Sequence, residues 1–205
     1  MKKHKIPLLD AQKRDVDAWL VEGIDVNEII KADREWRQIK KRHLDLCKQN
    51  GLPCPEHSHW NWENKMDNSA LFDMIQTRFA IVYQDEIQGL MLVERMTQYA
   101  KIPPDKGKPI VYIKFIEAAP QNVELYTNPR KFLGIGRVFL RAAVDFSMGE
   151  GCEGRIGLHA LPQAEEWYRK KIGMTELDCD PAHENLRYFE FTSNQAQEYM
   201  ERKNV

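Results

Sequence analysis

The sequence predicts an α/β fold, and three observations carry that prediction. The beginning of the chain is rich in helix signals, with helices expected over 11–21 and 26–48. From Phe79 onward the pattern changes to short apolar strands. After residue 109 a long apolar strand is followed by a pair of glycines, an apolar helical run, a short strand and another helix. Strands interleaved with helices in this way favour a sheet that carries helices on its faces.

The expected elements follow from local signals. Gly23 separates the first two helices, and Asp25 is a candidate N-cap for the second. After a break at 51–55 we expect a short helix at about 69–76, then strands over 79–83 and 87–93 joined by a tight turn at 84–86. We therefore divide the chain into an N-terminal helical extension with a Trp/His-rich segment, 1–65, and a core, 66–205.

Composition narrows the class of protein. A chain of 205 residues with 42% hydrophobic and 30% charged residues is ordinary for a soluble globular protein. The formal net charge of -1 argues against a broad nucleic-acid footprint. No apolar run is long enough to cross a bilayer, and no signal-peptide core follows Met1. The four cysteines lack Cys-x-x-Cys spacing, so we expect reduced thiols in a cytoplasmic protein; the oligomeric state is open.

The glycine pair is the strongest chemical signal. It lies in the run Lys131-Phe-Leu-Gly134-Ile-Gly136-Arg137. Glycine lets backbone amides approach a ligand closely, and the helix that follows adds its unpaired amides and positive dipole end. This arrangement suits a phosphate or pyrophosphate, held by the amides of Phe132, Leu133, Gly134, Ile135, Gly136 and Arg137. Other nucleotides use such a loop, but a third glycine and a downstream Lys-Ser/Thr are absent, which disfavours the Rossmann and P-loop alternatives.

The order of strand, glycine loop, helix, strand and tyrosine-bearing helix resembles the GNAT superfamily of CoA-dependent N-acetyltransferases. The resemblance covers roughly residues 78 to 190. Lys131 stands first in the acetyl-CoA motif Gln/Arg-x-x-Gly-x-Gly/Ala, and Tyr168 lies in the later aromatic-Tyr-(basic)-Gly-aromatic/Met helix end. The chain departs from the pattern in four places: Lys131 itself, a longer segment before it, Leu161 where many members have Asn, and an extra residue before Gly173.

The resemblance implies a mixed, mostly antiparallel central sheet flanked by helices, with an N-terminal helical extension. It also implies acetyl-CoA as co-substrate, bound between the strands 110–119 and 155–160, with Ala118 and Ala119 offering backbone groups to the acetyl-pantetheine arm. An unidentified amine acceptor would attack the thioester directly in a ternary complex, with no metal. The alternative is a catalytically silent CoA-binding or partner-binding module.

Two residues are candidates for catalysis. Strand alternation places Glu117 on the same face as Ile113 and Phe115, where partial burial would raise its pKa and suit a general base. The competing interpretation is a surface glutamate or a structural partner of an arginine. By the resemblance, Tyr168 would protonate the departing CoA thiolate. Its helical spacing with Ala164, Trp167 and Ile172 also fits a core aromatic residue.

The Trp/His-rich segment is the most distinctive stretch of this sequence. His59, Trp60 and Trp62 could form one wall of an acceptor pocket, or they could pack the N-terminal helices onto the core. His57 and His59 alternate like ligands on a strand, but no third ligand stands at a recognisable spacing, so we expect no metal site. His159 is interpreted as a hydrogen-bonded structural histidine.

Overall fold

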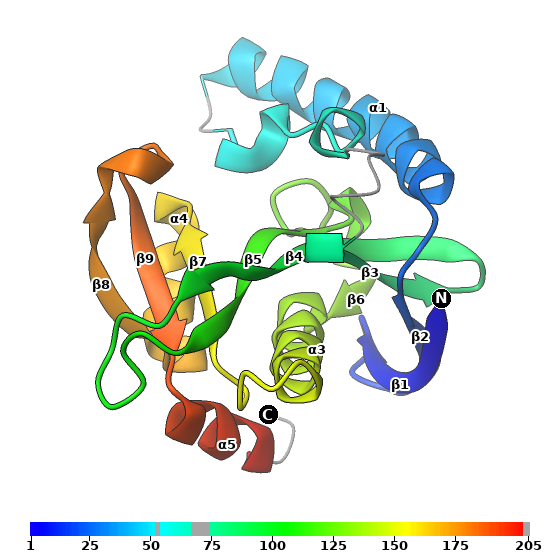
Figure 1. Cartoon of the computed structure of the whole chain (residues 1–205). Helices are drawn as coiled ribbons and strands as arrows, with labels where there is room; N and C mark the ends of the chain where they lie inside the picture. The colour runs from blue at the N-terminus through cyan, green and yellow to red at the C-terminus, as the bar shows by residue number, and fades with distance from the viewer. Residues whose placement is uncertain (52–53, 67–73, 203–205) are drawn as a thin grey trace. The chain divides into compact units, whose positions relative to one another are not determined.

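The computed structural model describes residues 1–51, 54–66 and 74–202 (Figure 1). Its strands form one nine-stranded sheet in the order β6-β1-β2-β3-β4-β5-β7-β9-β8. Strands β5 and β7 pair in parallel, whereas the pairs β1–β2, β1–β6, β2–β3, β7–β9 and β8–β9 are antiparallel, so the sheet is mixed and mostly antiparallel, as predicted. The strands are β1 (Lys2–Asp10), β2 (Asp15–Glu22), β3 (Gln76–Tyr83), β4 (Glu86–Tyr99), β5 (Pro109–Ala118), β6 (Phe132–Leu133), β7 (Ile156–Ala160), β8 (Thr175–Asp180) and β9 (Leu186–Phe191).

The helices are α1 (Val26–Asn50), α3 (Ile135–Gly149), α4 (Pro162–Glu166) and α5 (Ser193–Glu201). Short 3-10 turns are η1 (Glu56–His59), η2 (Glu63–Lys65), η3 (Pro120–Asn122) and η5 (Pro181–His183), and η4 (Trp167–Ile172) is a π-helical turn. By contacts the chain divides into two compact units. The first comprises Met1–Met91 and Ile116–Gly136, and the second comprises Leu92–Phe115 and Arg137–Val205. The predicted boundary at residue 65 stays a prediction.

In the first unit, the helix predicted over 11–21 is wrong. β1 and β2 form an antiparallel hairpin there, and β2 pairs in turn with β3. Residues of β2 alternate between exposed and covered, which is the period of a strand rather than of a helix. The carboxylate of Asp10 fixes the turn, because its Oδ1 accepts hydrogen bonds from the amides of Gln12 and Arg14 at 2.8 and 2.9 Å.

The second predicted helix is confirmed as α1. The side chain of Asp25 caps it by accepting from the amide of Asn27, and Gly51 ends it in the left-handed conformation at φ 64. Its buried stripe contains Trp36 together with two charged residues, Asp33 and Lys40. Figure 1 shows the cyan turns η1 and η2 beside α1.

The predicted strands 79–83 and 87–93 are confirmed as parts of β3 and β4. Gln84 and Asp85 connect them with φ of 49 and 61, the two positive values of a type I′ hairpin turn. The short helix predicted at 69–76 falls largely outside the described residues. The glycine pair does precede a helix, since β6, Gly134 and α3 follow one another directly.

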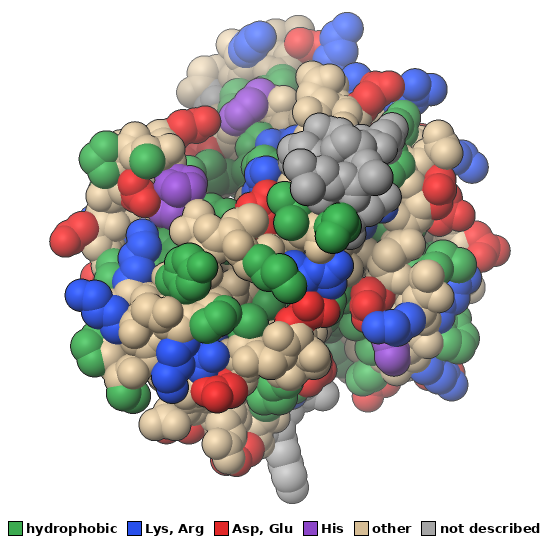
Figure 2. Space-filling view, in the orientation of Figure 1, with side chains coloured by type: hydrophobic (Ala, Val, Ile, Leu, Met, Phe, Trp, Pro, Cys, Tyr) green, Lys and Arg blue, Asp and Glu red, His purple; other side chains and the backbone are tan. Residues whose placement is uncertain are grey.

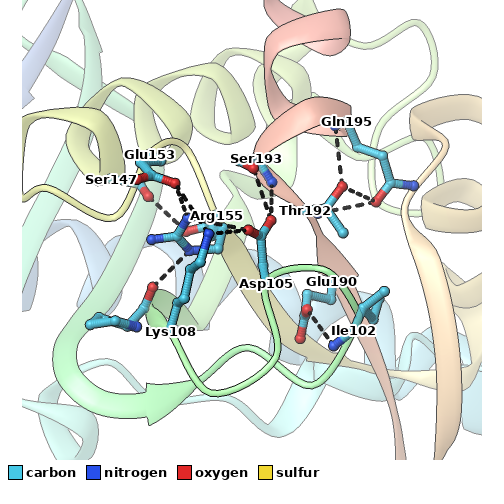
Figure 3. Close-up of polar contacts among 11 residues, drawn as sticks. Ile102, Asp105, Lys108, Ser147, Glu153, Arg155, Glu190, Thr192, Ser193 and Gln195 are labelled. Atoms are coloured by element: carbon cyan, nitrogen blue, oxygen red, sulfur yellow. Dashed lines mark hydrogen bonds and ion pairs between the residues drawn. The ribbon is translucent and has the colours of Figure 1, made fainter.

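In the second unit, β7 pairs with β5 and β9, and β8 covers the free edge of β9. A buried polar cluster holds the loop after β4 (Figure 3). Asp105 accepts hydrogen bonds from the amide and hydroxyl of Ser193 at 2.8 and 2.9 Å and from Lys108 at 2.9 Å. Glu190 accepts from the amides of Lys101 and Ile102. These bonds tie the loop to β9 and to the start of α5.

Acidic and basic side chains are interspersed over the visible surface (Figure 2), in keeping with the balanced formal charge. Among the described residues, no helix combines the length and the hydrophobicity needed to cross a membrane.

Candidate functional site

The glycine turn adopts the geometry that a phosphate loop requires. Gly134 has φ +79, a left-handed conformation that L side chains rarely adopt, and it is exposed. It lies between β6 and the first residue of α3, Ile135. The first amides of an α-helix have no acceptor within the helix. The first turn of α3, whose residues are all described, carries no acidic side chain, so its positive dipole end is not offset from within that turn.

The amide of Phe132, one of the predicted loop amides, is already bonded within the fold, as is the amide of Lys131 before it. The amide of Lys131 donates to the Gln121 carbonyl at 2.9 Å, and that of Phe132 donates to Oδ1 of the buried Asn122 at 2.9 Å. The amide of Phe132 would have to give up its bond to Asn122 before it could bind a phosphate. The ammonium of Lys131 lies 2.6 Å from Glu86 in an exposed ion pair, which also lowers the pKa of Glu86. Such a pair contributes little energy and can be exchanged for a phosphate.

Strands β5 and β7, which were expected to frame the cofactor, pair over only part of their lengths. Among the described residues, the register of β5 with β7 runs from Val111–Ile156 to Ile113–Leu158. β7 nevertheless continues to Ala160, and β5 continues to Ala118. Backbone groups beyond the paired stretch are therefore not used by this ladder. Of the two alanines predicted to bind the acetyl-pantetheine arm, Ala118 is half-buried, while the amide of Ala119 donates to the Gln88 carbonyl at 3.0 Å.

Glu117 is buried, and a polar side chain lies against each of its two carboxylate oxygens. Lys40 Nζ lies 2.5 Å from its Oε1, and Trp62 Nε1 donates to its Oε2 at 2.6 Å. Burial raises the pKa of Glu117, while the Lys40 charge and the hydrogen bonds from Lys40 and Trp62 oppose that rise. Asp33 on α1 is also fully buried, and its charge raises the pKa of Glu117 further. Arg37 Nε lies 3.3 Å from Asp33 Oδ2. The carboxylate therefore belongs to a buried charge cluster rather than to an exposed surface.

The Trp/His-rich segment divides between this cluster and the surface. Trp62 is only 1% exposed because it packs against Glu117, whereas His59 is exposed. Trp60 is half-buried, its carbonyl accepts from Lys40 at 3.3 Å, and Lys65 lies over its ring at 4.6 Å. Trp62 therefore packs inside the protein, whereas His59 is exposed and Trp60 is half-buried; their contact with an acceptor stays a prediction.

Tyr168 lies in the second unit, on the π-helical turn η4. Its carbonyl accepts from the amides of Gly173 and Met174 at 3.0 and 3.1 Å, a wider loop than an α-helix makes. A π-helical turn absorbs one additional residue, which accounts for the extra residue seen before Gly173 in the sequence. Tyr168 is buried and its ring lies 5.7 Å from that of Phe189. Burial raises its pKa above the ordinary range, so the hydroxyl stays protonated at neutral pH.

The architecture agrees with solved structures. The GNAT domain of S. lividans PAT matches with a TM-score of 0.54 at 10% identity, over 91% of this chain and 96% of that one. The chain has the GNAT fold. The Bacillus subtilis N-acetyltransferase YlbP in complex with coenzyme A matches at TM-score 0.41 and 18% identity, over 57% of this chain and 68% of that one. No protein-family model and no curated protein matches the sequence.

No motif in the sequence points directly to the Lys40–Glu117 contact, yet the pattern of α1 contains an indication of it. On α1, Asp33 and Lys40 share the helical phase of Ile29, Trp36 and Cys47, which are all buried. A lysine and an aspartate on the apolar stripe of an amphipathic helix predict buried charge partners elsewhere in the chain.

Proposed function

We propose that the chain is an acyl-CoA-dependent N-acetyltransferase that moves an acetyl group from acetyl-CoA to an amine acceptor by direct attack in a ternary complex. The observation that carries this proposal is the left-handed turn at Gly134 leading straight into α3, placed on a GNAT fold. The end of the β5–β7 register supports it, because it leaves strand backbone available to the pantetheine arm.

The proposed chemistry needs an unprotonated amine, alignment and a stabilised leaving group. Glu117 is the proposed general base that accepts a proton from the acceptor ammonium. Tyr168 is the proposed donor to the departing thiolate, and its raised pKa suits that role because the proton is present at neutral pH. His59 and Trp60 are proposed to face the acceptor. A cytoplasmic location belongs to the same proposal, in keeping with four cysteines that are present as thiols.

The loop is tested by calorimetric titration of acetyl-CoA into the wild-type protein and two variants. Gly134→Asp adds a carboxylate where the pyrophosphate would bind. Gly151→Asp is the matched control, because Gly151 is also exposed, has φ +76 and has open space around an added Cβ. We expect micromolar binding to the wild type and to the control, and loss in Gly134→Asp. Absence of binding to the wild type would refute the proposal.

A catalytically silent CoA-binding module is the second candidate, and one observation favours it. The side chain of Glu117 is 1% exposed and has Lys40 and Trp62 against its two oxygens, so an acceptor from solvent reaches the carboxylate only after neighbouring side chains move. Release of free CoA thiol across a panel of primary amines separates the candidates. Acceptor-dependent release that Glu117→Gln abolishes supports the transferase; CoA binding with no acceptor-dependent release supports the silent module.

A further inference from the structure

Three side chains with metal-ligating atoms meet in the second unit. They are His159 on β7, Asp180 at the end of β8 and His183 at the end of η5, none of which has been given a catalytic or cofactor-binding role above. Asp180 Oδ2 lies 3.3 Å from His159 Nε2 and 3.2 Å from His183 Nδ1. The ligand atoms of all three lie within 4.8 Å of one another.

The fold, rather than sequence spacing, creates this cluster. β9 lies between β7 and β8, with His159 opposite Tyr188 and Asp180 opposite Leu186. Oδ1 of Asp180 accepts from the amide of Ala182 at 2.9 Å, which caps η5 and leaves Oδ2 facing the histidines. The single turn of η5 then returns His183 to the side of Asp180.

The distances fit a particular coordination geometry. Zinc binds imidazole nitrogen and carboxylate oxygen at about 2.0–2.2 Å, so two ligand atoms of a tetrahedral site lie roughly 3.3–3.5 Å apart. The two measured separations from Asp180 Oδ2, 3.3 and 3.2 Å, are close to that edge length. We propose that His159, Asp180 and His183 bind a divalent zinc-type ion through two imidazole nitrogens and one carboxylate oxygen, with the fourth position open to solvent.

The buried ligand is already oriented for this task. The side chain of His159 is 4% exposed, and within the described part of the chain its buried Nε2 has no hydrogen-bond partner. Its other nitrogen, Nδ1, lies 2.8 Å from the Tyr112 hydroxyl. When Nδ1 carries the proton and donates it to that oxygen, the Nε2 lone pair points at the cluster. A buried nitrogen without a hydrogen-bond partner is unfavourable, and coordination to a metal ion would satisfy it.

Two side chains must adjust. The rings of His159 and His183 stack at 3.9 Å and 11°, so their in-plane lone pairs cannot meet at one ion until His183 turns. The ammonium of Lys101 lies 3.6 Å from Asp180 Oδ2 and must move away. Both movements are open to these side chains, because that of His183 is 35% exposed and that of Lys101 is 41% exposed.

The site is tested with CoCl2 added to metal-free, reduced full-length protein, because tetrahedral cobalt(II) has strong visible absorption. We expect these bands to saturate at one equivalent, to be displaced by zinc, and to be lost in His183→Gln and Asp180→Asn. His4→Gln is the control, since His4 is exposed on β1. Tyr112→Phe should weaken cobalt binding about 10- to 100-fold, as expected when the partner of a ligating histidine is removed.

Circular dichroism checks that each variant is folded. We expect His183→Gln to fold, because the side chain of His183 is 35% exposed. Wild-type protein without tetrahedral bands would overturn the proposal. So would bands that persist in folded His183→Gln, or a thiolate-to-cobalt charge-transfer band, which would place the ion on cysteine. None of these readouts depends on acetyl transfer.

Discussion

Lys40 of α1 and Glu117 of β5 form a buried ion pair with 2.5 Å between Nζ and Oε1. Neither residue has appreciable contact with solvent, and the indole of Trp62 completes the shell of the carboxylate. The pair links the helix of the N-terminal segment to the strand that carries the proposed base. If Glu117 is catalytic, its charge state is set by a helix that lies outside residues 78–190, the stretch of the sequence that carries the acetyltransferase motifs.

Removing one partner of this pair should be costly. Lys40→Met or Glu117→Gln strands a buried charge and should lower the free energy of unfolding by about 3–5 kcal/mol. The double variant Lys40→Met/Glu117→Gln removes both charges and should cost clearly less than the sum of the two. Urea unfolding of the four proteins measures this coupling. Additive losses would mean that the two charges do not interact.

Tyr168→Phe separates chemistry from binding. Loss of the proposed proton donor should reduce the rate of acetyl transfer about 100-fold or more, while the affinity for acetyl-CoA stays unchanged. Tyr99→Phe is the control, because Tyr99 is exposed at the end of β4. Steady-state rates with calorimetric affinities give both quantities. A Tyr168→Phe enzyme with the wild-type rate would make Tyr168 a packing residue only.

Mild acid should weaken the fold through His57. Burial, followed by the charges of Lys40 and His59, lowers the pKa of His57 from 6.5 to about 4. Because the unfolded chain binds this proton more readily than the folded one, stability is fully present above pH 6.5 and is lost as the pH falls toward 4. The loss at pH 4 should reach up to about 3 kcal/mol.

The measurement is urea unfolding of wild type and His57→Gln between pH 7 and pH 4. Glutamine does not titrate in this range. The free energy of unfolding of the wild type should therefore fall relative to that of His57→Gln as the pH falls from 7 to 4. Parallel pH profiles would show that His57 is not responsible.

Asp105 should be a structural rather than a functional residue. Burial alone would raise its pKa, but bonds from Ser193 and Lys108 lower it to about 2. Asp105→Asn weakens these charge-assisted bonds and should cost about 2 kcal/mol of stability at pH 7. Since the folded pKa lies below the unfolded one, this contribution is present above about pH 4 and fades toward pH 2. Acetyl-CoA affinity should be unchanged, and a large loss of affinity would contradict the assignment.

Motifs with local causes were predictable from the sequence. The cap at Asp25, the type I′ turn at Gln84–Asp85 and the turn at Gly134 are set by a few neighbouring residues. The segment 11–21 was mistaken for a helix, because β2 is held as a strand by its pairing with β1 and β3, which the local sequence does not reveal. Tertiary pairing overrode a weak local signal there.

The site depends more strongly on contacts between distant residues. Glu117 was identified as a candidate, but Lys40 and Trp62 reach it from far along the chain. The His159–Asp180–His183 cluster was not foreseen, because it arises where β9 brings β7 and β8 together. Neither contact produces a spacing pattern in the sequence. The position of Lys40 on the apolar stripe of α1 was nevertheless visible.

The two-residue strand β6 has a single partner strand, β1, with Leu9 opposite Leu133 and Asp10 opposite Phe132. The strand leading into the glycine turn is therefore held by the first ten residues of the chain. A protein trimmed to residues 78–190, the stretch that carries the acetyl-CoA motif, would keep Gly134 and Gly136 and still lose this brace. For cloning and for engineering, the N-terminal hairpin must accompany the loop.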